Sequence, residues 1–495
     1  MNFGIKRGLG PQSEPMFQGW TFFAVCPSGS GLGPTVEVIT ILSAFWNKTF
    51  GALAAKATRR CSFPICELTL CKAIELTMQS WQSLLMFGWT AAVLCSNSAA
   101  QELPATEESG LAVSSNLVVK NFSVDQITPA SMDEISRAAG AYLARMVNAE
   151  GMFVYRYHAD SDFEEPSYNI IRHAGTAFAM MEYYAYSGDD TVKGASQRAL
   201  DRLLKFGQPS MKSGDKAIWI VEDMNYRLGA NALTLLALAQ WTEATGDRSY
   251  MDSMHLIAEG IIECLREDGW FVCNIRMLDG IESDIGSEYF PGEAIFALTR
   301  LYQLDPNPRW LEAAKKGAAH QIHIRDRGKT PAELPHDHWL MYSLNELHRL
   351  DPQPIYKEHA YKLAEAMILG QRRDPDPPEY VGGYKDPPRC TATATHSEGL
   401  MAVYAIAVRE GDIEVQAKTI EAAKLAIAFQ CRSFIDAKRA EQYPNPCRAL
   451  GGFTESPEVH VVQIDGVQHN LSSLLAMHRA LVRLEKKRDV PAADR

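Results

Sequence analysis

Apolar residues recur with the spacing of α-helices over almost all of residues 129–485. Six segments are apolar or small on nearly every side, and each opens with a polar or glycine-bearing phrase. They are residues 172–189, 227–247, 289–305, 336–351, 395–412 and 466–481. A more amphipathic segment precedes each of them, at roughly 131–148, 192–206, 249–266, 309–324, 355–371 and 413–433. The pattern therefore predicts twelve helices arranged as six hairpins.

The connections between these helices are of two kinds. The turns that leave the apolar helices are tight and contain Gly-Asp or Leu-Asp, as at residues 187–189, 245–247 and 304–305. The loops that enter them are long, about 10 to 30 residues, and rich in Gly, Pro, aromatic and charged residues. We expect small β-hairpins to be inserted in these long loops.

The alternation of the two helix types has a simple packing solution. An apolar helix must be surrounded on all sides, whereas an amphipathic helix keeps one face in water. Six of each kind predict an all-α fold, an (α/α)6 toroid with an inner and an outer ring. Because strict alternation makes the inner helices parallel, their polar N-termini should meet at one rim and form a funnel.

This alternation and these polar helix starts resemble the six-hairpin glycosidase superfamily, which includes glycoside hydrolases, uronate lyases and sugar epimerases. The resemblance covers roughly residues 130–485 and rests on architecture, since no catalytic signature of one member family aligns with the chain. It implies a carbohydrate-active enzyme that acts on a glycan in the funnel. Prenyltransferase and terpene-cyclase toroids share the architecture, but their acidic DDxxD or DxDD runs are missing from the sequence.

The first hundred residues differ from the remainder. They hold five of the ten cysteines and seven Lys or Arg against four Glu, whereas the whole chain has a net charge of −11. From Met78 the sequence looks like an export signal, with an apolar core too short to span a membrane and small residues before Gln101. We expect a signal peptide at 78–100, with 1–77 as an extension upstream of the true start. The mature protein would be secreted or periplasmic with no stable membrane span; a signal-anchored membrane protein is the alternative.

The remaining boundaries follow from polarity and periodicity. Residues 101–128 are polar and aperiodic, and are predicted to be a disordered linker. Ser131 and Glu134 have the spacing of a capping box and predict the start of the first helix. The toroid domain is expected at 129–485, and a polar tail at 486–495.

Composition narrows the classes of partner. The chain is 46% hydrophobic and 22% charged, as in ordinary globular proteins. Its negative charge argues against a nucleic-acid surface. The absence of a P-loop, dinucleotide fingerprint or zinc ribbon leads us to expect no cofactor. The resemblance to six-hairpin glycosidases implies a carbohydrate substrate. The cysteines after residue 100 are odd in number and do not read as a disulfide scaffold: Cys264, Cys273, Cys390, Cys431 and Cys447.

Acidic residues and a histidine at the starts of the apolar helices are candidate catalytic groups. They are Glu293, Asp337, Glu398 and His469. A carboxyl group that is half-desolvated where a helix meets the funnel has a raised pKa and can act as a general acid. Asp337 could instead act as a general base or bind sugar hydroxyls. Capping is the competing explanation, because acidic residues favour helix N-termini.

Other polar and aromatic residues near these helix starts are candidates for binding the substrate. The guanidinium of Arg172 suits carboxylates and sugar hydroxyls, and Trp339 offers a stacking platform. His336 and His338 are two residues apart, which points their imidazoles away from each other on a helix, so no metal site is expected. The candidate set is Arg172, His173, Asp223, Asn231, Tyr289, His338, Trp339, His396, Asp465 and Gln468.

The candidate residues leave the reaction open. Glycoside hydrolysis needs a pair of carboxyl groups held a fixed distance apart, whereas a lyase or epimerase needs His, Tyr or Arg near the reacting sugar carbon. Both sets are present. Converging helix dipoles favour an anionic, uronate-bearing glycan, although the negative net charge opposes it. Two other classes fit the same pattern: a glycan-binding toroid without catalysis, and a helical scaffold that binds a protein partner.

Overall fold

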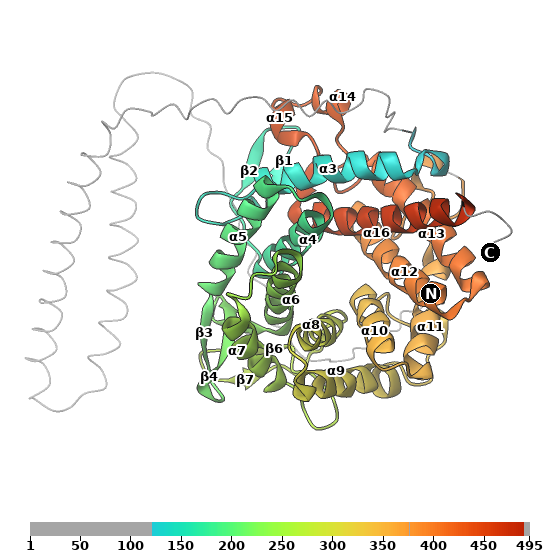
Figure 1. Cartoon of the computed structure of the whole chain (residues 1–495). Helices are drawn as coiled ribbons and strands as arrows, with labels where there is room; N and C mark the ends of the chain where they lie inside the picture. Colours follow the sequence, from blue (N-terminus) through green and yellow to red (C-terminus); the bar gives the residue numbers. More distant parts are fainter. Residues whose placement is uncertain (1–120, 376, 490–495) are drawn as a thin grey trace, which may run out of the picture. The chain divides into compact units, whose positions relative to one another are not determined.

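The computed structural model describes residues 121–375 and 377–489, which build two concentric rings of helices (Figure 1). The inner ring contains α4 (Ile170–Ser187), α6 (Leu228–Thr245), α8 (Phe290–Leu304), α10 (His338–Leu350), α12 (Cys390–Glu410) and α16 (Ile464–Asp489). The outer ring contains α3 (Pro129–Arg145), α5 (Asp190–Leu204), α7 (Met251–Ile262), α9 (Pro308–His320), α11 (Pro354–Gly370) and α13 (Ile413–Arg432). The predicted (α/α)6 toroid of six hairpins is confirmed.

Neighbouring inner helices pack directly on one another around the ring. α4 contacts α6, α6 contacts α8, and the series continues through α10 and α12 to α16. α16 packs in turn against α4, so the last inner helix closes the ring onto the first (Figure 1). The outer helices lie outside this ring, for example α5 on α4 and α13 on α12.

Burial separates the two kinds of helix. In α6, 15 of 18 residues are buried, so no face of this helix is left for solvent. In α5, the buried residues are Val192, Ala195, Ser196, Ala199, Leu200 and Leu203. This spacing follows one face of a helix with 3.6 residues per turn, which is the pattern of an outer helix with one solvated side.

Tight Gly-Asp turns link α4, α6 and α12 to the outer helices that follow them. Gly188 and Gly411 end α4 and α12 with φ of 69° and 72°, a left-handed conformation that glycine adopts without steric cost. The aspartate that follows caps the next helix: Asp189 accepts from the backbone N–H of Thr191 at 2.9 Å, and Asp412 caps α13 in the same way. Two residues thus reverse the chain.

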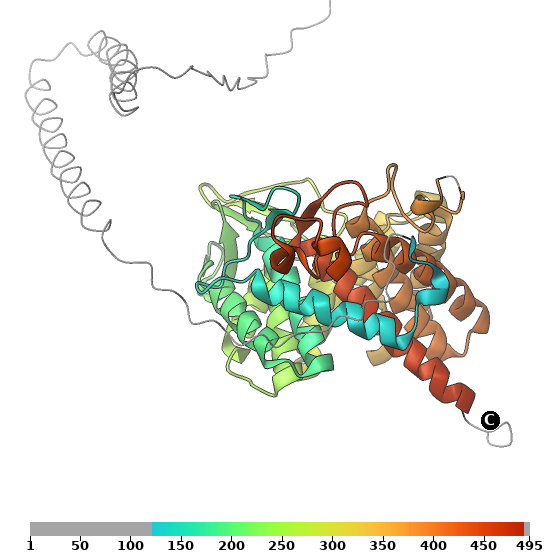
Figure 2. The ribbon, with the colours of Figure 1, turned by 90° about the horizontal axis from the view of Figure 1, so that it is seen from above.

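The long loops carry two small antiparallel sheets, as predicted. One sheet has the order β2-β1-β8, from β1 (Arg156–His158), β2 (Phe163–Glu165) and β8 (Val461–Gln463). The other has the order β3-β4-β5-β6-β7, from β3 (Gly207–Ser210), β4 (Gly214–Glu222), β5 (Asn225–Arg227), β6 (Asn274–Arg276) and β7 (Ile281–Glu282). The loops also contain η3 (Val124–Gln126), η4 (Gln321–Arg325), η5 (Pro331–Glu333), η6 (Pro378–Tyr380), α14 (Ala437–Ala440) and α15 (Pro446–Ala449). The side view places the long loops along the upper edge of the ring and the tight turns along the lower edge (Figure 2).

Several boundaries differ from the prediction. The first helix is capped by Thr128, which exchanges hydrogen bonds with Ser131, so the predicted Ser131–Glu134 box is one turn too late. Phe122 is fully buried and η3 follows it, so residues 121–128 pack onto the domain and are not a disordered linker. α12 begins at Cys390, five residues before the predicted start.

The polar C-terminal tail was predicted too long, because α16 continues to Asp489. The predicted signal peptide, the segment 1–77 and most of the linker lie outside the described residues. None of the helices in residues 121–375 and 377–489 combines the length and apolar character that a membrane span requires. The five cysteines of this part of the chain are free thiols.

Candidate active site

Three residues from three inner helices meet in one buried cluster. His338 is the first residue of α10, Glu398 lies in α12 and His469 lies in α16. Glu398 Oε2 lies 3.0 Å from His469 Nδ1 and 3.6 Å from His338 Nε2. The two imidazole rings are 5.3 Å apart and nearly perpendicular. We call these three residues the His-Glu-His cluster; it brings together side chains of three different inner helices.

Burial sets the protonation of this cluster. Its side chains are at most 4% exposed. Burial raises the pKa of Glu398 to about 7, against the lowering effect of the His469 imidazole and its hydrogen bond. Burial lowers the pKa of His338 well below its usual value, and neighbouring positive charge adds to the effect. Near neutral pH the cluster therefore combines a neutral imidazole with a carboxyl group close to its midpoint, which suits proton exchange.

The same three side chains could hold a divalent cation. One donor atom from each lies within 4.8 Å of the others, and neither ring nitrogen of His338 makes a hydrogen bond. Two imidazoles and one carboxylate form a donor set that Zn²⁺ accepts in enzymes. Sequence spacing did not suggest this group, since Glu398 and His469 are 71 residues apart.

An ion pair borders the cluster on the side of α4 and α16. Arg172 Nε lies 3.3 Å from Asp465 Oδ2. The Arg172 side chain is 43% exposed whereas that of Asp465 is 3% exposed, so the guanidinium is available to solvent while the carboxylate anchors it. Gln463 donates a further hydrogen bond to Asp465 Oδ1 at 2.9 Å. The positive charge of Arg172 also acts on His338 and on Glu293.

Glu293 is a buried carboxyl group in the first turn of α8. Burial raises its pKa to about 8; the nearby Arg172 lowers it and Asp337 raises it further. Its Oε2 has no hydrogen-bond partner within the described residues. Gly229 of α6 makes room for it, because a Cβ at that position would lie 2.6 Å from Oε2. At neutral pH Glu293 is therefore a protonated acid, as the sequence analysis predicted for such a position.

The two aromatic candidates lie in different surroundings. Tyr289 is 39% exposed, and its ring lies 5.8 Å from that of His338. Trp339 is only 4% exposed and packs against Phe296 and His338 inside the ring. Trp339 is as enclosed as the His-Glu-His cluster itself, and its role as a stacking platform stays a prediction. Tyr289 is the candidate aromatic that a ligand can reach.

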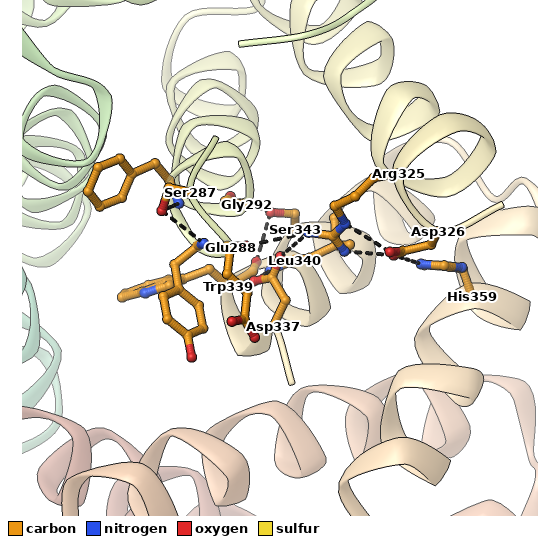
Figure 3. A network of polar contacts seen from close by, with 12 residues as sticks. Ser287, Glu288, Gly292, Arg325, Asp326, Asp337, Trp339, Leu340, Ser343 and His359 are labelled. Atoms are coloured by element: carbon orange, nitrogen blue, oxygen red, sulfur yellow. Dashed lines mark hydrogen bonds and ion pairs between the residues drawn. The ribbon is translucent and has the colours of Figure 1, made fainter. Parts of the chain in front are cut away.

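Asp337 is fully buried and both of its oxygens are engaged (Figure 3). Oδ1 accepts from the backbone N–H of Leu340 at 3.0 Å and so caps α10. Oδ2 accepts from Arg325 Nη1 at 2.9 Å. Burial raises the pKa of Asp337 to about 6 although Arg325 opposes it. These contacts are structural, and they correct the prediction that Asp337 is a catalytic acid or base.

Three further candidates do not join the site. His173 Nε2 contacts the carbonyl oxygen of Ala199 at 3.0 Å, and its Nδ1 contacts the hydroxyl of Tyr168; burial lowers its pKa to about 3. The side-chain amide of Asn231 accepts from the backbone N–H of Ile220 and donates to its carbonyl oxygen, which joins α6 to β4. Asp223 is exposed in the turn between β4 and β5, with φ of 49°. Their polar side chains serve the fold, which corrects their assignment to substrate binding.

His396 and Gln468 lie within the walls of the site. His396 contacts His336 at 2.6 Å and stacks on Tyr384 with ring centroids 3.9 Å apart. Gln468 is 2% exposed and packs against Gly175 of α4. Sequence reasoning missed Tyr384, Arg325 and Gly229, because their roles come from contacts between distant segments and no local pattern marks them.

No protein-family model and no curated protein matches the sequence. Solved structures do match the fold. A D-mannose isomerase has a TM-score of 0.54 and 13% identity, covering 71% of this chain and 98% of its own. The cellobiose 2-epimerase from Bacillus thermoamylovorans has a TM-score of 0.55 and 12% identity, covering 71% and 99%. An alpha-1,6-mannanase of Salegentibacter sp. has a TM-score of 0.50 and 12% identity, covering 70% and 99%. At these identities the likeness shows a shared fold.

Proposed function

Because the chain folds as a six-hairpin glycosidase-like toroid, we propose that it is a sugar-processing enzyme that transfers a proton at a sugar carbon, as an isomerase or epimerase. The observation that supports this most is the His-Glu-His cluster, in which two imidazoles share one buried carboxyl group. Two solved structures with this fold are a mannose isomerase and a cellobiose 2-epimerase, so open-chain aldoses are the first substrates to consider.

The cluster provides an acid and a base. His469 Nδ1 lies 3.0 Å from Glu398 Oε2, and when Nδ1 carries the proton, Nε2 has a free lone pair and can act as a base. His338 is neutral, with neither ring nitrogen in a hydrogen bond. One imidazole removes the proton from the carbon next to the sugar carbonyl. That imidazole becomes an imidazolium, while the electron pair forms a C=C bond and leaves a negative charge on oxygen. The imidazolium passes its proton through the Glu398 carboxylate to the other imidazole. The second imidazole returns the proton to the same carbon from the opposite face, and the electron pair on oxygen re-forms the carbonyl.

Two flanking groups suit the intermediate of this reaction. The exposed guanidinium of Arg172, anchored on Asp465 at 3.3 Å, can stabilise the negative oxygen. Glu293, with a pKa of about 8, is protonated at neutral pH and can donate a hydrogen bond to the same oxygen or to a neighbouring hydroxyl. Tyr289 is exposed beside His338 and can pack on the sugar face.

Glycoside hydrolysis is the second candidate. The buried, protonated Glu293 is a suitable general acid, and a structure of this fold is an alpha-1,6-mannanase. Hydrolysis also needs an ionised carboxylate opposite that acid. Asp337 is engaged by Arg325 and Leu340, and Asp465 by Arg172. Since the buried imidazoles have no role in that scheme, we rank proton transfer first.

The decisive experiment is solvent exchange. The protein is incubated in D₂O with mannose, glucose, cellobiose and an alpha-1,6-mannooligosaccharide, and products are followed by NMR. Deuterium at the carbon next to the carbonyl, with a second sugar appearing, supports the proposal. New reducing ends without exchange would favour hydrolysis, and an unsaturated product would favour a lyase. Binding without turnover would identify a glycan-binding toroid and contradict the enzyme proposal.

A further inference from the structure

A cavity of about 580 Å³ lies between the segment after α9 and helix α11, and none of the His-Glu-His residues lines it. Part of its lining is apolar and comes from Ile322, Leu334 and Ile355. The rest is polar: three cations, Arg327, Lys329 and Lys362, outnumber two carboxylates, Asp326 and Glu358. A hollow of this size admits a small molecule.

The charges around this cavity favour an anion. Arg327 and Lys362 are exposed and form no ion pair with any other described residue. The carboxylate of Asp326 is already held by Arg325, Lys329 and His359, at 2.7, 3.2 and 3.0 Å. Although burial raises the pKa of Asp326, hydrogen bonds from His359 and Arg325 lower it below its usual value. The whole chain has a net charge of −11, but at this cavity Arg327 and Lys362 are cations without an ion-pair partner among the described residues.

A chain of buried ion pairs runs from the cavity to the start of α10 (Figure 3). His359 Nε2 contacts Asp326 at 3.0 Å, and Arg325 binds Asp326 through Nε and Nη2. The same guanidinium donates from Nη1 to Asp337 at 2.9 Å. Asp337 caps α10, whose first residue is His338. A change at Asp326 is therefore two ion pairs away from an imidazole of the His-Glu-His cluster.

We propose that this cavity binds a small ligand with a phosphate-type oxyanion group, and that its occupancy is transmitted to His338 through Asp326, Arg325 and Asp337. An oxyanion bound by Arg327 and Lys362 competes with Asp326 for Lys329. Asp326 then depends more on its ion pair with Arg325. This changes how the Arg325 guanidinium is shared between Asp326 and Asp337. The binding site stands independently of the proposed sugar chemistry; only an effect on turnover rests on it.

Binding is tested with inorganic phosphate on the full chain. Its melting temperature and calorimetric Kd are measured against chloride at equal ionic strength. The double variant Arg327→Gln/Lys362→Gln should bind phosphate at least about tenfold more weakly. The matched control Lys316→Gln/Lys438→Gln removes two exposed cations that do not line the cavity and should bind as the wild type does. Equal Kd values in all three proteins, or no phosphate effect beyond that of chloride, would overturn the proposal.

Transmission is tested by histidine NMR with ¹⁵N-labelled imidazoles. In the wild type, phosphate should shift the His338 ring resonances. Arg325→Lys keeps the positive charge but loses the three nitrogens that bridge Asp326 and Asp337. In this variant phosphate should still bind, but the His338 ring resonances should not shift. If Arg325→Lys does not fold, Asp326→Asn serves the same purpose, because it leaves Arg327 and Lys362 in place and removes the carboxylate that Arg325 and Lys329 share. Phosphate binding with no His338 shift in the wild type would refute the coupling. Neither readout needs a sugar substrate, so failure of the exchange assay leaves them interpretable.

Discussion

Glu398 and His469 face each other from two neighbouring inner helices, with Oε2 3.0 Å from Nδ1. This contact fixes which imidazole nitrogen is free, because a carboxylate on Nδ1 favours the tautomer that carries its proton there. The pair comes from adjacent helices, α12 and α16. Its geometry therefore depends on the packing of the ring and not on any loop.

Replacing His469 should abolish proton exchange without unfolding the protein. We expect His469→Gln to lower the deuterium-exchange rate by roughly 10²–10⁴-fold, the usual contribution of a positioned acid or base. His478→Gln is the matched control, since His478 lies on the same helix beside Tyr186. Exchange rates and melting temperatures are compared for both. Equal loss of activity in the two variants would mean that the effect is structural.

Glu293 should make the protein less stable at high pH. Its pKa of about 8 in the folded protein exceeds the ordinary glutamate pKa of 4.5, so the native state binds more protons than the unfolded chain between these values. The stabilising contribution is full below about pH 4.5 and is lost as pH rises through about 8. Urea unfolding from pH 5 to 9 should therefore show a decline that Glu293→Gln reduces. Parallel curves for the two proteins would contradict the raised pKa.

Asp337→Asn should destabilise the protein strongly. Asparagine can still cap α10, but it leaves the buried Arg325 guanidinium with one carboxylate fewer. Breaking a buried ion pair costs about 3–5 kcal/mol. Asp412→Asn is the control, because Asp412 caps α13 without an ion pair among the described residues, and it should change the free energy of unfolding little. Similar losses in both variants would show that capping alone is involved.

Chelation should leave the reaction unchanged. The His-Glu-His cluster could hold a divalent cation, but the proposed step uses these side chains directly for proton transfer. Dialysis against EDTA followed by metal analysis and the exchange assay tests this. Loss of exchange that Zn²⁺ restores would assign the cluster to a metal instead.

The mature protein should begin near Gln101. Residues 78–100 look like an export signal, and we propose that they are removed on export. N-terminal sequencing of protein recovered outside the cytoplasm measures this directly. An exported protein that retains residues 1–77 would refute the proposal.

The sequence predicted the ring but not the roles of its carboxylates. Apolar periodicity and the Gly-Asp turns depend on neighbours within a few positions, so the six hairpins could be located from local pattern alone. Asp337 and Glu398 both lie in the first part of an apolar helix, and local pattern treats them alike. Their roles differ because their partners differ. Asp337 pairs with Arg325, whereas Glu398 pairs with His469, which lies 71 residues further along the chain. Those contacts exist only after the helices pack.

The contact between α16 and α4 has a consequence for the order of synthesis. Because α16 is the last inner helix and supplies both Asp465 and His469, a nascent chain that stops before residue 464 has five inner helices and an open seam. Such a chain lacks the anchor for Arg172 and one imidazole of the cluster. Helix α16 thus closes the ring by packing against both α12 and α4. Closure of the ring and assembly of the His-Glu-His cluster therefore depend on the same helix, and a chain without α16 lacks both.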